Sequence, residues 1–292
     1  MGTRRRFGMA ACGLLAASGF RRSWAAQDRL EDIGPALAAV EARCGGRLGV
    51  GIIDTGSGRA VGHRTDERFP MCSTHKAMSA AAILSRVDAG QERLDRRVHF
   101  AADTVIDYSP VTKAHAGPAG MTLATICEAA ITLSDNTAAN LMFAALGGPA
   151  GVTAFLRGIG DQDTRLDRTE PTLNEARPGD LRDTTTPLAM AGTLQRLVLG
   201  DTLLPLSRAQ LADWLITGQT GGARLRAGVP ATWRVGEKTG TNDHGTANDV
   251  GVLWPPGRPP LVVTAFVTAS VAPLDAQNAA IAAVARLVAE RA

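Results

Sequence analysis

Strand-like segments lie near the two ends of this chain and are nearly absent from the long stretch between them. Residues 48–53 form a short apolar run typical of a buried strand, and the turn at 54–58 leads into a second one. Residues 249–254 and 261–268 have the same character. The pattern therefore predicts a sheet with a large insertion between its first and last strands.

Helical patterns occupy the insertion and both ends of the chain. Apolar residues recur at helical spacing in 29–43 and again in the last segment, where Asp275 is expected to cap a helix. Residues 77–87 are apolar on most sides, which predicts a helix running through the interior. We expect an α+β fold: a five-stranded antiparallel sheet flanked by terminal helices, with an inserted all-helical lobe.

The 292 residues are enough for one large domain or two interleaved lobes. We assign residues 27–70 and 217–292 to an α/β lobe and residues 71–216 to the helical lobe. Within the latter, 165–183 is rich in Pro, Thr, Asp and Arg and breaks the helical pattern. Long loops of this kind are usually functional or disordered.

Residues 1–26 have the composition of an export signal. Arg4, Arg5 and Arg6 precede a modest apolar stretch, and small residues follow at Ala25 and Ala26. This arrangement resembles a twin-arginine signal peptide, which predicts a periplasmic or secreted protein. An arginine-rich N-terminus without such a role is the alternative.

The formal net charge of +3 depends on that leader. Five of the 31 basic residues lie in residues 1–26, which contain no acid, so 26 basic residues face 28 acidic ones in the remainder. The charge therefore gives no support for nucleic-acid binding. No apolar run approaches the roughly 18 residues that a membrane span needs. We expect a monomer without nucleic-acid or membrane partners.

The cysteines and histidines give no metal-binding pattern. Cys44, Cys72 and Cys127 follow the leader, and an odd number leaves at least one free thiol. Their spacing matches no zinc motif, and the five histidines form no H-E-x-x-H pair. We predict no metal and no cofactor.

Lysine is rare in this chain, which has 28 arginines and three lysines. Lys76 follows Ser73 by three residues at the head of the apolar helix, so one helical turn places both side chains on one face. A desolvated lysine can activate a serine hydroxyl as a nucleophile. The alternative, a serine cap with a solvent-facing lysine, fits an apolar helix poorly.

Two further motifs are individually weak. Ser134-Asp135-Asn136 separates two helical segments, and alone it indicates only a helix stop and cap. Lys238-Thr239-Gly240-Thr241 follows a strand-like run, where a lysine and hydroxyls on an edge strand can hold a carboxylate.

Together, S-x-x-K, S-D-N and K-T-G in this order are the signature of penicillin-recognising serine enzymes. Glu170-Pro171-Thr172-Leu173-Asn174 also resembles the E-x-x-L-N motif of class A β-lactamases. The resemblance extends from about residue 28 to the C-terminus. It implies that Glu170 and Asn174 activate the water that cleaves an acyl-enzyme on Ser73. It also implies a cis Glu170–Pro171 bond. The alternative to the catalytic role is that Glu170 is an ordinary solvated acid of the loop.

The resemblance implies roles for other residues. The backbone N–H groups of Ser73 and Thr241 would stabilise the oxyanion, and Ser134 would relay a proton to the leaving nitrogen. The acylation base, Lys76 or Glu170, stays open. The remaining assignments are a pocket wall at Tyr108, a substrate amide contact at Asn136, a carboxylate site at Lys238, Thr239, Thr241 and Arg224, and a loop ion pair between Arg168 and Asp183.

The chain departs from the family at several positions. Cys72 resembles carbapenem-hydrolysing members, but its usual disulfide partner is Asn242 here, and the partner expected for Cys127 is Ala80. Neither family disulfide is therefore expected. His75 occupies a place that usually holds an aromatic or small polar residue. The alternatives to a lactamase are a DD-peptidase or esterase of the same superfamily, and a non-catalytic β-lactam sensor.

Overall fold

The centre of the molecule is one five-stranded antiparallel sheet with strand order β2-β1-β9-β8-β7. The computed structural model describes residues 30–292 and the first two residues, so the predicted export signal lies almost wholly outside the described residues. Two strands from the start of the chain complete a sheet built mainly by its end, which confirms the predicted α+β fold. The strands are β1 (Arg47–Asp54), β2 (Arg59–His63), β7 (Arg234–Asn242), β8 (Thr246–Trp254) and β9 (Leu261–Thr268).

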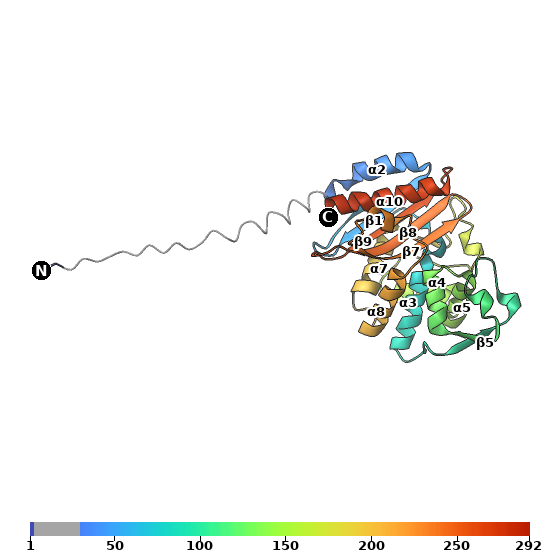
Figure 1. Cartoon of the computed structure of the whole chain (residues 1–292). Helices are drawn as coiled ribbons and strands as arrows, with labels where there is room; N and C mark the ends of the chain where they lie inside the picture. Colours follow the sequence, from blue (N-terminus) through green and yellow to red (C-terminus); the bar gives the residue numbers. More distant parts are fainter. Residues whose placement is uncertain (3–29) are drawn as a thin grey trace.

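Two terminal helices cover one face of the sheet (Figure 1). Helix α2 (Ile33–Cys44) ends at Gly45, whose φ of 71° is a left-handed conformation that glycine adopts at low cost. Helix α10 (Leu274–Arg291) packs beside it, and the apolar side chains of both helices bury the outer face of β1, β8 and β9. The expected Asp275 cap is wrong: Pro273 holds the cap position, and Asp275 lies in the first turn.

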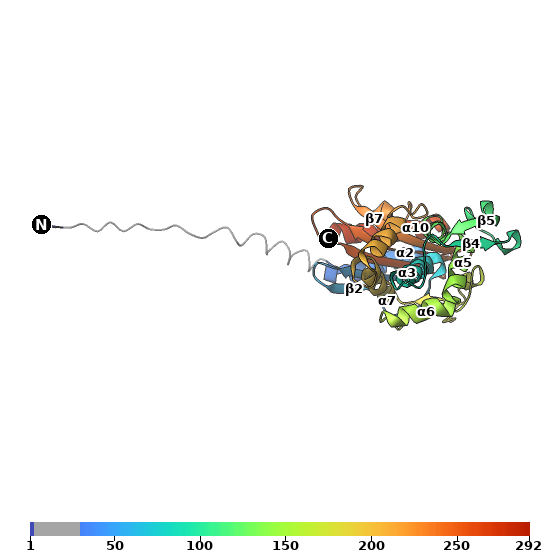
Figure 2. The ribbon, with the colours of Figure 1, turned by 90° about the horizontal axis from the view of Figure 1, so that it is seen from below.

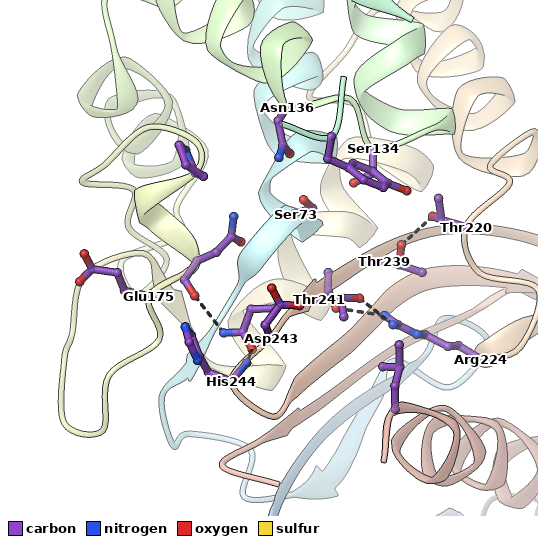
Figure 3. A pocket seen from close by; sticks show the side chains of 16 residues that line it. Ser73, Ser134, Asn136, Glu175, Thr220, Arg224, Thr239, Thr241, Asp243 and His244 are labelled. Atoms are coloured by element: carbon purple, nitrogen blue, oxygen red, sulfur yellow. Dashed lines mark hydrogen bonds between the residues drawn. The ribbon is translucent and has the colours of Figure 1, made fainter. Parts of the chain in front are cut away.

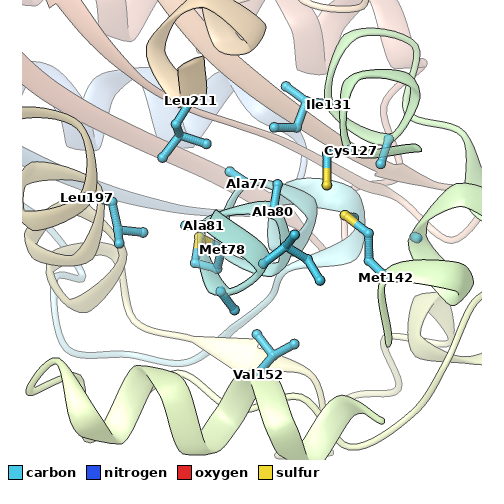
Figure 4. Packing of buried hydrophobic residues seen from close by; sticks show 14 of the residues in the cluster. Ala77, Met78, Ala80, Ala81, Cys127, Ile131, Met142, Val152, Leu197 and Leu211 are labelled. Carbon is cyan, nitrogen blue, oxygen red and sulfur yellow. The ribbon is translucent and has the colours of Figure 1, made fainter. Parts of the chain in front are cut away.

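The inserted helices pack on the opposite face of the sheet and form the larger hydrophobic core. Helix α3 (His75–Asp88) runs through its centre, and every residue from His75 to Leu84 is buried. Figure 4 shows small residues of α3 such as Ala77 and Ala80 surrounded by side chains of neighbouring helices. Alanine lets these helices approach closely, and the interior helix predicted from the sequence is confirmed.

The remaining helices complete the insertion and the return to the sheet. They are α4 (Leu123–Thr132), α5 (Asn136–Leu146), α6 (Pro149–Gly158), α7 (Pro187–Leu194), α8 (Pro205–Ile216) and α9 (Leu225–Gly228), with short helical turns η1 (Cys72–Thr74), η2 (Ala102–Thr104), η3 (Thr112–Ala114), η4 (Thr172–Asn174) and η5 (Gln195–Leu199).

The insertion is mainly helical but also contributes strands to two short antiparallel ribbons. One pairs β4 (Arg97–Phe100) with β5 (Gly117–Thr122), which Figure 2 shows at one end of the helical part. The other pairs β3 (Phe69–Pro70) with β6 (Thr184–Thr185). The expected all-helical lobe is therefore corrected in this detail. Such short strands lack the alternating pattern that would reveal them in the sequence.

Within residues 1–2 and 30–292, no single helix has the length and apolar composition of a membrane span. Among the described helices, only α5 and α6 taken together reach that composition, and they meet at a bend of 67°.

Candidate active site

A pocket of about 630 Å³ lies where the edge strand β7 meets the helical insertion (Figure 3). Ser73 is part of its lining and belongs to η1, the turn that leads directly into α3. The side chain of Asn248 on β8 fixes the preceding segment, since its Nδ2 donates to the carbonyl oxygens of Pro70 (2.8 Å) and Met71 (3.1 Å). The sheet thus holds the start of α3 in place.

Ser73 and Lys76 meet as the helical spacing predicts. Lys76 Nζ donates to Ser73 Oγ at 2.8 Å, and the lysine side chain is fully buried. Burial lowers the pKa of Lys76 below its usual value, while the nearby carboxylate of Glu170 opposes this by stabilising the ammonium.

The other contacts of Lys76 Nζ are mostly with groups that can only accept a hydrogen bond. They are the carbonyl oxygen of Ser134 at 2.7 Å, Asn136 Oδ1 at 2.7 Å and Glu170 Oε1 at 3.1 Å. Together with Ser73 Oγ, these groups give Nζ four oxygen neighbours within 3.1 Å, and three of the four can only accept. This arrangement favours the protonated form of Lys76 in the free protein.

Glu170 lies on the loop opposite Ser73, and only 3% of its surface is exposed. Its Oε1 is 3.4 Å from Ser73 Oγ, and its Oε2 accepts a hydrogen bond from Asn174 Nδ2 at 2.5 Å. The peptide bond that follows Glu170 is cis, as expected. Burial alone would raise the pKa of Glu170, but the charge of Lys76 and hydrogen bonding lower it to about 2. The carboxylate is therefore ionised at neutral pH.

Ser134 lies between two lysines. Lys238 Nζ donates to Ser134 Oγ at 3.0 Å, and Lys76 Nζ is 3.4 Å from the same oxygen. Lys238 is buried, which lowers its pKa well below the usual value, and the charge of Lys76 acts in the same direction. The hydroxyl of Ser134 therefore has a proton donor on each side.

The outer wall of the pocket comes from β7 and from two loops. Thr239 and Thr241 line it from β7, and Tyr108 lines it from the facing loop with 61% of its surface exposed. Asn136 Nδ2 donates to the carbonyl oxygen of Asp107, which ties that loop to α5. Tyr108, Asn136, Thr239 and Thr241 were all proposed from the sequence, and the structure brings them to one pocket.

Arg224 also lines the pocket, although it is only 5% exposed. Its Nη1 donates to the carbonyl oxygens of Gly240 (3.0 Å) and Asn248 (2.6 Å), and its Nη2 donates to Thr241 Oγ1 at 2.7 Å. Asn278 Oδ1 accepts from Nε at 2.8 Å. The guanidinium is thus fixed behind β7, with Thr241 between it and the open part of the pocket (Figure 3).

The ion pair between Arg168 and Asp183 is present beneath the loop and does not line the pocket. Arg168 Nε lies 2.6 Å from Asp183 Oδ2, and Asp183 Oδ1 accepts the N–H groups of Asp167 (2.8 Å) and Arg168 (3.0 Å). Asp183 is fully buried, so these contacts join the two ends of the loop that carries Glu170.

Sequence reasoning missed several residues that support the site. Asn140 hydrogen bonds to the backbone of Glu170, and Thr220 Oγ1 lies 2.6 Å from Thr239 Oγ1. Asn140 had a usable signal: it is one helical turn after Asn136 and shares its face of α5. Thr220 and Asn248 had none, because neither lies on a helix that carries one of the motifs.

The described residues contain no cluster of three or more metal-ligating side chains. Cys44, Cys72 and Cys127 are buried free thiols, and burial raises the pKa of each. In place of a disulfide, Asn242 donates from Nδ2 to the carbonyl oxygen of Asn174 at 2.9 Å, which connects β7 to the loop.

Comparison with known proteins gives a consistent result. The profile of the β-lactamase enzyme family matches residues 32–292. The chain is 49% identical to β-lactamase CTX-M-8 of Citrobacter amalonaticus, covering 88% of each chain, and 51% identical to β-lactamase L2 of Stenotrophomonas maltophilia, covering 86% of this chain and 83% of the relative. An ancestral class A β-lactamase structure is 63% identical with a TM-score of 0.88, covering 89% of this chain and 99% of that one.

Proposed function

The chain belongs to the class A β-lactamase family, and from this premise we propose that it hydrolyses penicillins and cephalosporins through an acyl-enzyme on Ser73. The observation that carries the proposal is the position of Glu170. Its buried, ionised carboxylate contacts Ser73, Lys76 and Asn174 at once. A lactamase needs such a base to release the product, whereas a DD-peptidase or a sensor would not.

In the first step Ser73 attacks the lactam carbonyl. Lys76 has its N–H groups directed to acceptors, so it stabilises negative charge, and Glu170 receives the serine proton. The backbone N–H groups of Ser73 and Thr241 stabilise the oxyanion. Ser134 passes its proton to the leaving nitrogen and is reprotonated by Lys76. Lys76 in turn takes the serine proton back from Glu170, 3.1 Å away, so that Glu170 is ionised again.

In the second step water attacks the ester. Glu170 takes a proton from that water and passes it to Ser73 Oγ as the ester bond breaks, and Asn174 holds both the carboxylate and the water in position. No metal or cofactor takes part in the proposal.

The substrate carboxylate binds at β7. Lys238 supplies charge, and the hydroxyls of Thr239 and Thr241 supply hydrogen bonds, with Arg224 behind Thr241. Tyr108 forms the opposite wall, and Asn136 contacts the amide of the substrate side chain. The proposed substrate range extends to carbapenems. Cys72, Thr241 and Arg224 are the residues that support this extension. Hydrolysis rates for one penicillin, one cephalosporin and one carbapenem test this range.

The mechanism is tested with Glu170→Gln, which keeps the shape of the side chain but removes the base. Mass spectrometry after mixing with a penicillin is expected to show a long-lived adduct on Ser73, while the parent protein recovers promptly. Parent-like turnover by Glu170→Gln would contradict the role of Glu170. A parent protein that stays acylated would indicate a sensor, and one that cleaves D-Ala-D-Ala peptides without hydrolysing penicillin would indicate a DD-peptidase.

We also propose export of a monomeric enzyme by the twin-arginine route, on the basis of Arg4, Arg5 and Arg6. Replacement of these arginines by lysine should leave the protein in the cytoplasm. Normal export of that variant would contradict the proposed route, and sedimentation of the exported protein measures its oligomeric state.

A further inference from the structure

His75 is a buried titratable group that the mechanism above does not use. It is the first residue of α3, between Ser73 and Lys76 in sequence order, and its side chain has no exposed surface. Its ring stacks on Phe143 of α5, with centroids 5.1 Å apart and an interplanar angle of 19°. A phenylalanine ring could stack in the same way, so packing alone does not explain why this position carries a ring with two nitrogens.

Each ring nitrogen of His75 has one polar neighbour. Nδ1 lies 3.2 Å from Ser79 Oγ, and Nε2 lies 3.4 Å from Oε1 of Glu170. Ser79 is fully buried, and its hydroxyl can either donate or accept. The carboxylate of Glu170 can only accept.

These chemical roles select one tautomer. If Nε2 carried no proton, its lone pair would face the negative oxygen of Glu170. With the proton on Nε2, the ring donates to Glu170, and Nδ1 accepts from the hydroxyl of Ser79. Burial lowers the pKa of His75, so the ring is neutral. A neutral imidazole has one donor and one acceptor nitrogen, which matches this pair of neighbours.

We propose that His75, as the neutral tautomer protonated on Nε2 and fixed by Ser79, is a positioning residue that orients the carboxylate of Glu170 for deacylation. The inference rests on the hydrolysis proposed above. Oε1 then receives hydrogen bonds from both His75 and Lys76, while Oε2 receives one from Asn174. When Ser73 is acylated and its hydroxyl is lost, His75 keeps its contact with Oε1.

Other titratable groups surround this pair from every neighbouring element. Lys76 on α3 and Lys238 on β7 disfavour a second positive charge on the ring, and both favour an ionised Glu170. The thiol of Cys72 in η1 is neutral because burial raises its pKa. Asp135, which caps α5, interacts with Lys76. Among these groups, only His75 and Lys76 donate to Oε1.

Nitrogen NMR of the full chain with labelled histidine tests the tautomer without any activity assay. The expected signal is a neutral ring with the proton on Nε2 across neutral pH, identified by its loss in His75→Gln. Ser79→Ala should mix the tautomers. An imidazolium at neutral pH, or a proton on Nδ1, would overturn the proposal.

Kinetics of three variants test the positioning role. In His75→Phe, which keeps the ring but loses both nitrogens, we expect kcat to fall about three- to tenfold, the range that a weak hydrogen bond to a charged group supplies. KM should fall with it as the acyl-enzyme accumulates, and the acid limb of kcat should move to higher pH. His75→Gln, whose amide can reach the Nε2 position, should recover part of the loss. The surface variant His115→Gln serves as the matched control.

A packing role predicts the opposite order, because Phe keeps the stack on Phe143 and Gln does not. If His75→Phe matches the parent in kcat and pH profile while His75→Gln is impaired, the positioning role is wrong. The penicillin adduct on Ser73 of Glu170→Gln shows whether the role of His75 or the proposed hydrolysis itself is wrong. A trapped adduct with parent-like His75→Phe rejects only the role of His75, whereas a parent protein that does not hydrolyse penicillin rejects the function.

Discussion

The side-chain amide of Asn140 hydrogen bonds to both backbone groups of Glu170. Its Oδ1 accepts from the Glu170 N–H at 2.9 Å, and its Nδ2 donates to the Glu170 carbonyl oxygen at 2.9 Å. Helix α5 thereby fixes the backbone of the proposed base, while Asn174 and Lys76 fix its carboxylate. The loop that carries Glu170 is thus attached to the helical core at its functional residue.

Asn140→Ala should lower both activity and stability. It leaves two backbone groups of Glu170 without partners, which costs about 2 kcal/mol of unfolding free energy. Small displacement of the base should reduce kcat on the order of tenfold. Denaturant unfolding and penicillin hydrolysis measure the two effects. Asn140→Asp, which retains the acceptor but loses the donor, should be intermediate, and parent-like kinetics for Asn140→Ala would refute this support.

Gly240→Ala should displace the nucleophile from β7. A Cβ atom at Gly240 would lie 2.5 Å from the carbonyl oxygen of Met71 and 3.1 Å from the backbone nitrogen of Ser73. We expect a loss of about 1–3 kcal/mol in stability and a marked fall in acylation rate. The matched control is Gly222→Ala, where the added Cβ has no neighbour within 4 Å. Equal behaviour of the two variants would show that the close approach is unimportant.

Arg224→Ala should weaken substrate binding. The change removes the donors to Gly240, Asn248 and Thr241 and withdraws positive charge from the carboxylate site. We expect KM for a penicillin to rise about tenfold, as for loss of a charge-assisted contact. Arg224→Lys should recover little, because an ammonium cannot reproduce the fork of donors. A β-lactam ester without the carboxylate is the control, and an equal rise in its KM would contradict the assigned role.

Acid should destabilise the protein partly through Glu41. Burial opposes ionisation of this group, but hydrogen bonds from Arg64, the Leu48 N–H and His63 lower its pKa from 4.5 to about 2. A carboxyl whose pKa is lower in the folded state stabilises the fold above pH 4.5 and loses that contribution as pH falls toward 2. Because the pair with Arg64 is partly exposed, the contribution is on the order of 1 kcal/mol.

Unfolding curves of Glu41→Gln across this pH window should therefore show weaker acid destabilisation than those of the parent. The control is Glu290→Gln, an exposed acid whose only ion-pair contact in the described structure is with Arg291 at 3.9 Å. If the unfolding free energies of the parent and Glu41→Gln depend on pH in the same way, Glu41 does not contribute to acid destabilisation.

Much of the fold could be read from periodicity. Apolar runs located β1, β8 and β9, and helical spacing located α2, α3 and α10. The ribbon of β3 and β6 escaped detection because each strand has two residues and therefore no period, and β5 in the other ribbon does not alternate between buried and exposed residues. The Asp275 cap was wrong because the N-cap position is held by Pro273, two residues earlier than expected.

The sequence alone determined that Ser73 and Lys76 meet, because one helical turn fixes their contact. It also determined the family, because three motifs and the loop motif occur in a fixed order. Only the tertiary structure decided that Lys238 and Lys76 share the hydroxyl of Ser134, that Asn140 holds Glu170, and that the second nitrogen of His75 faces the same carboxylate. Helical spacing relates residues three or four apart, whereas these contacts join residues 30 to 104 positions apart. Their geometry arises only when the insertion packs against the sheet.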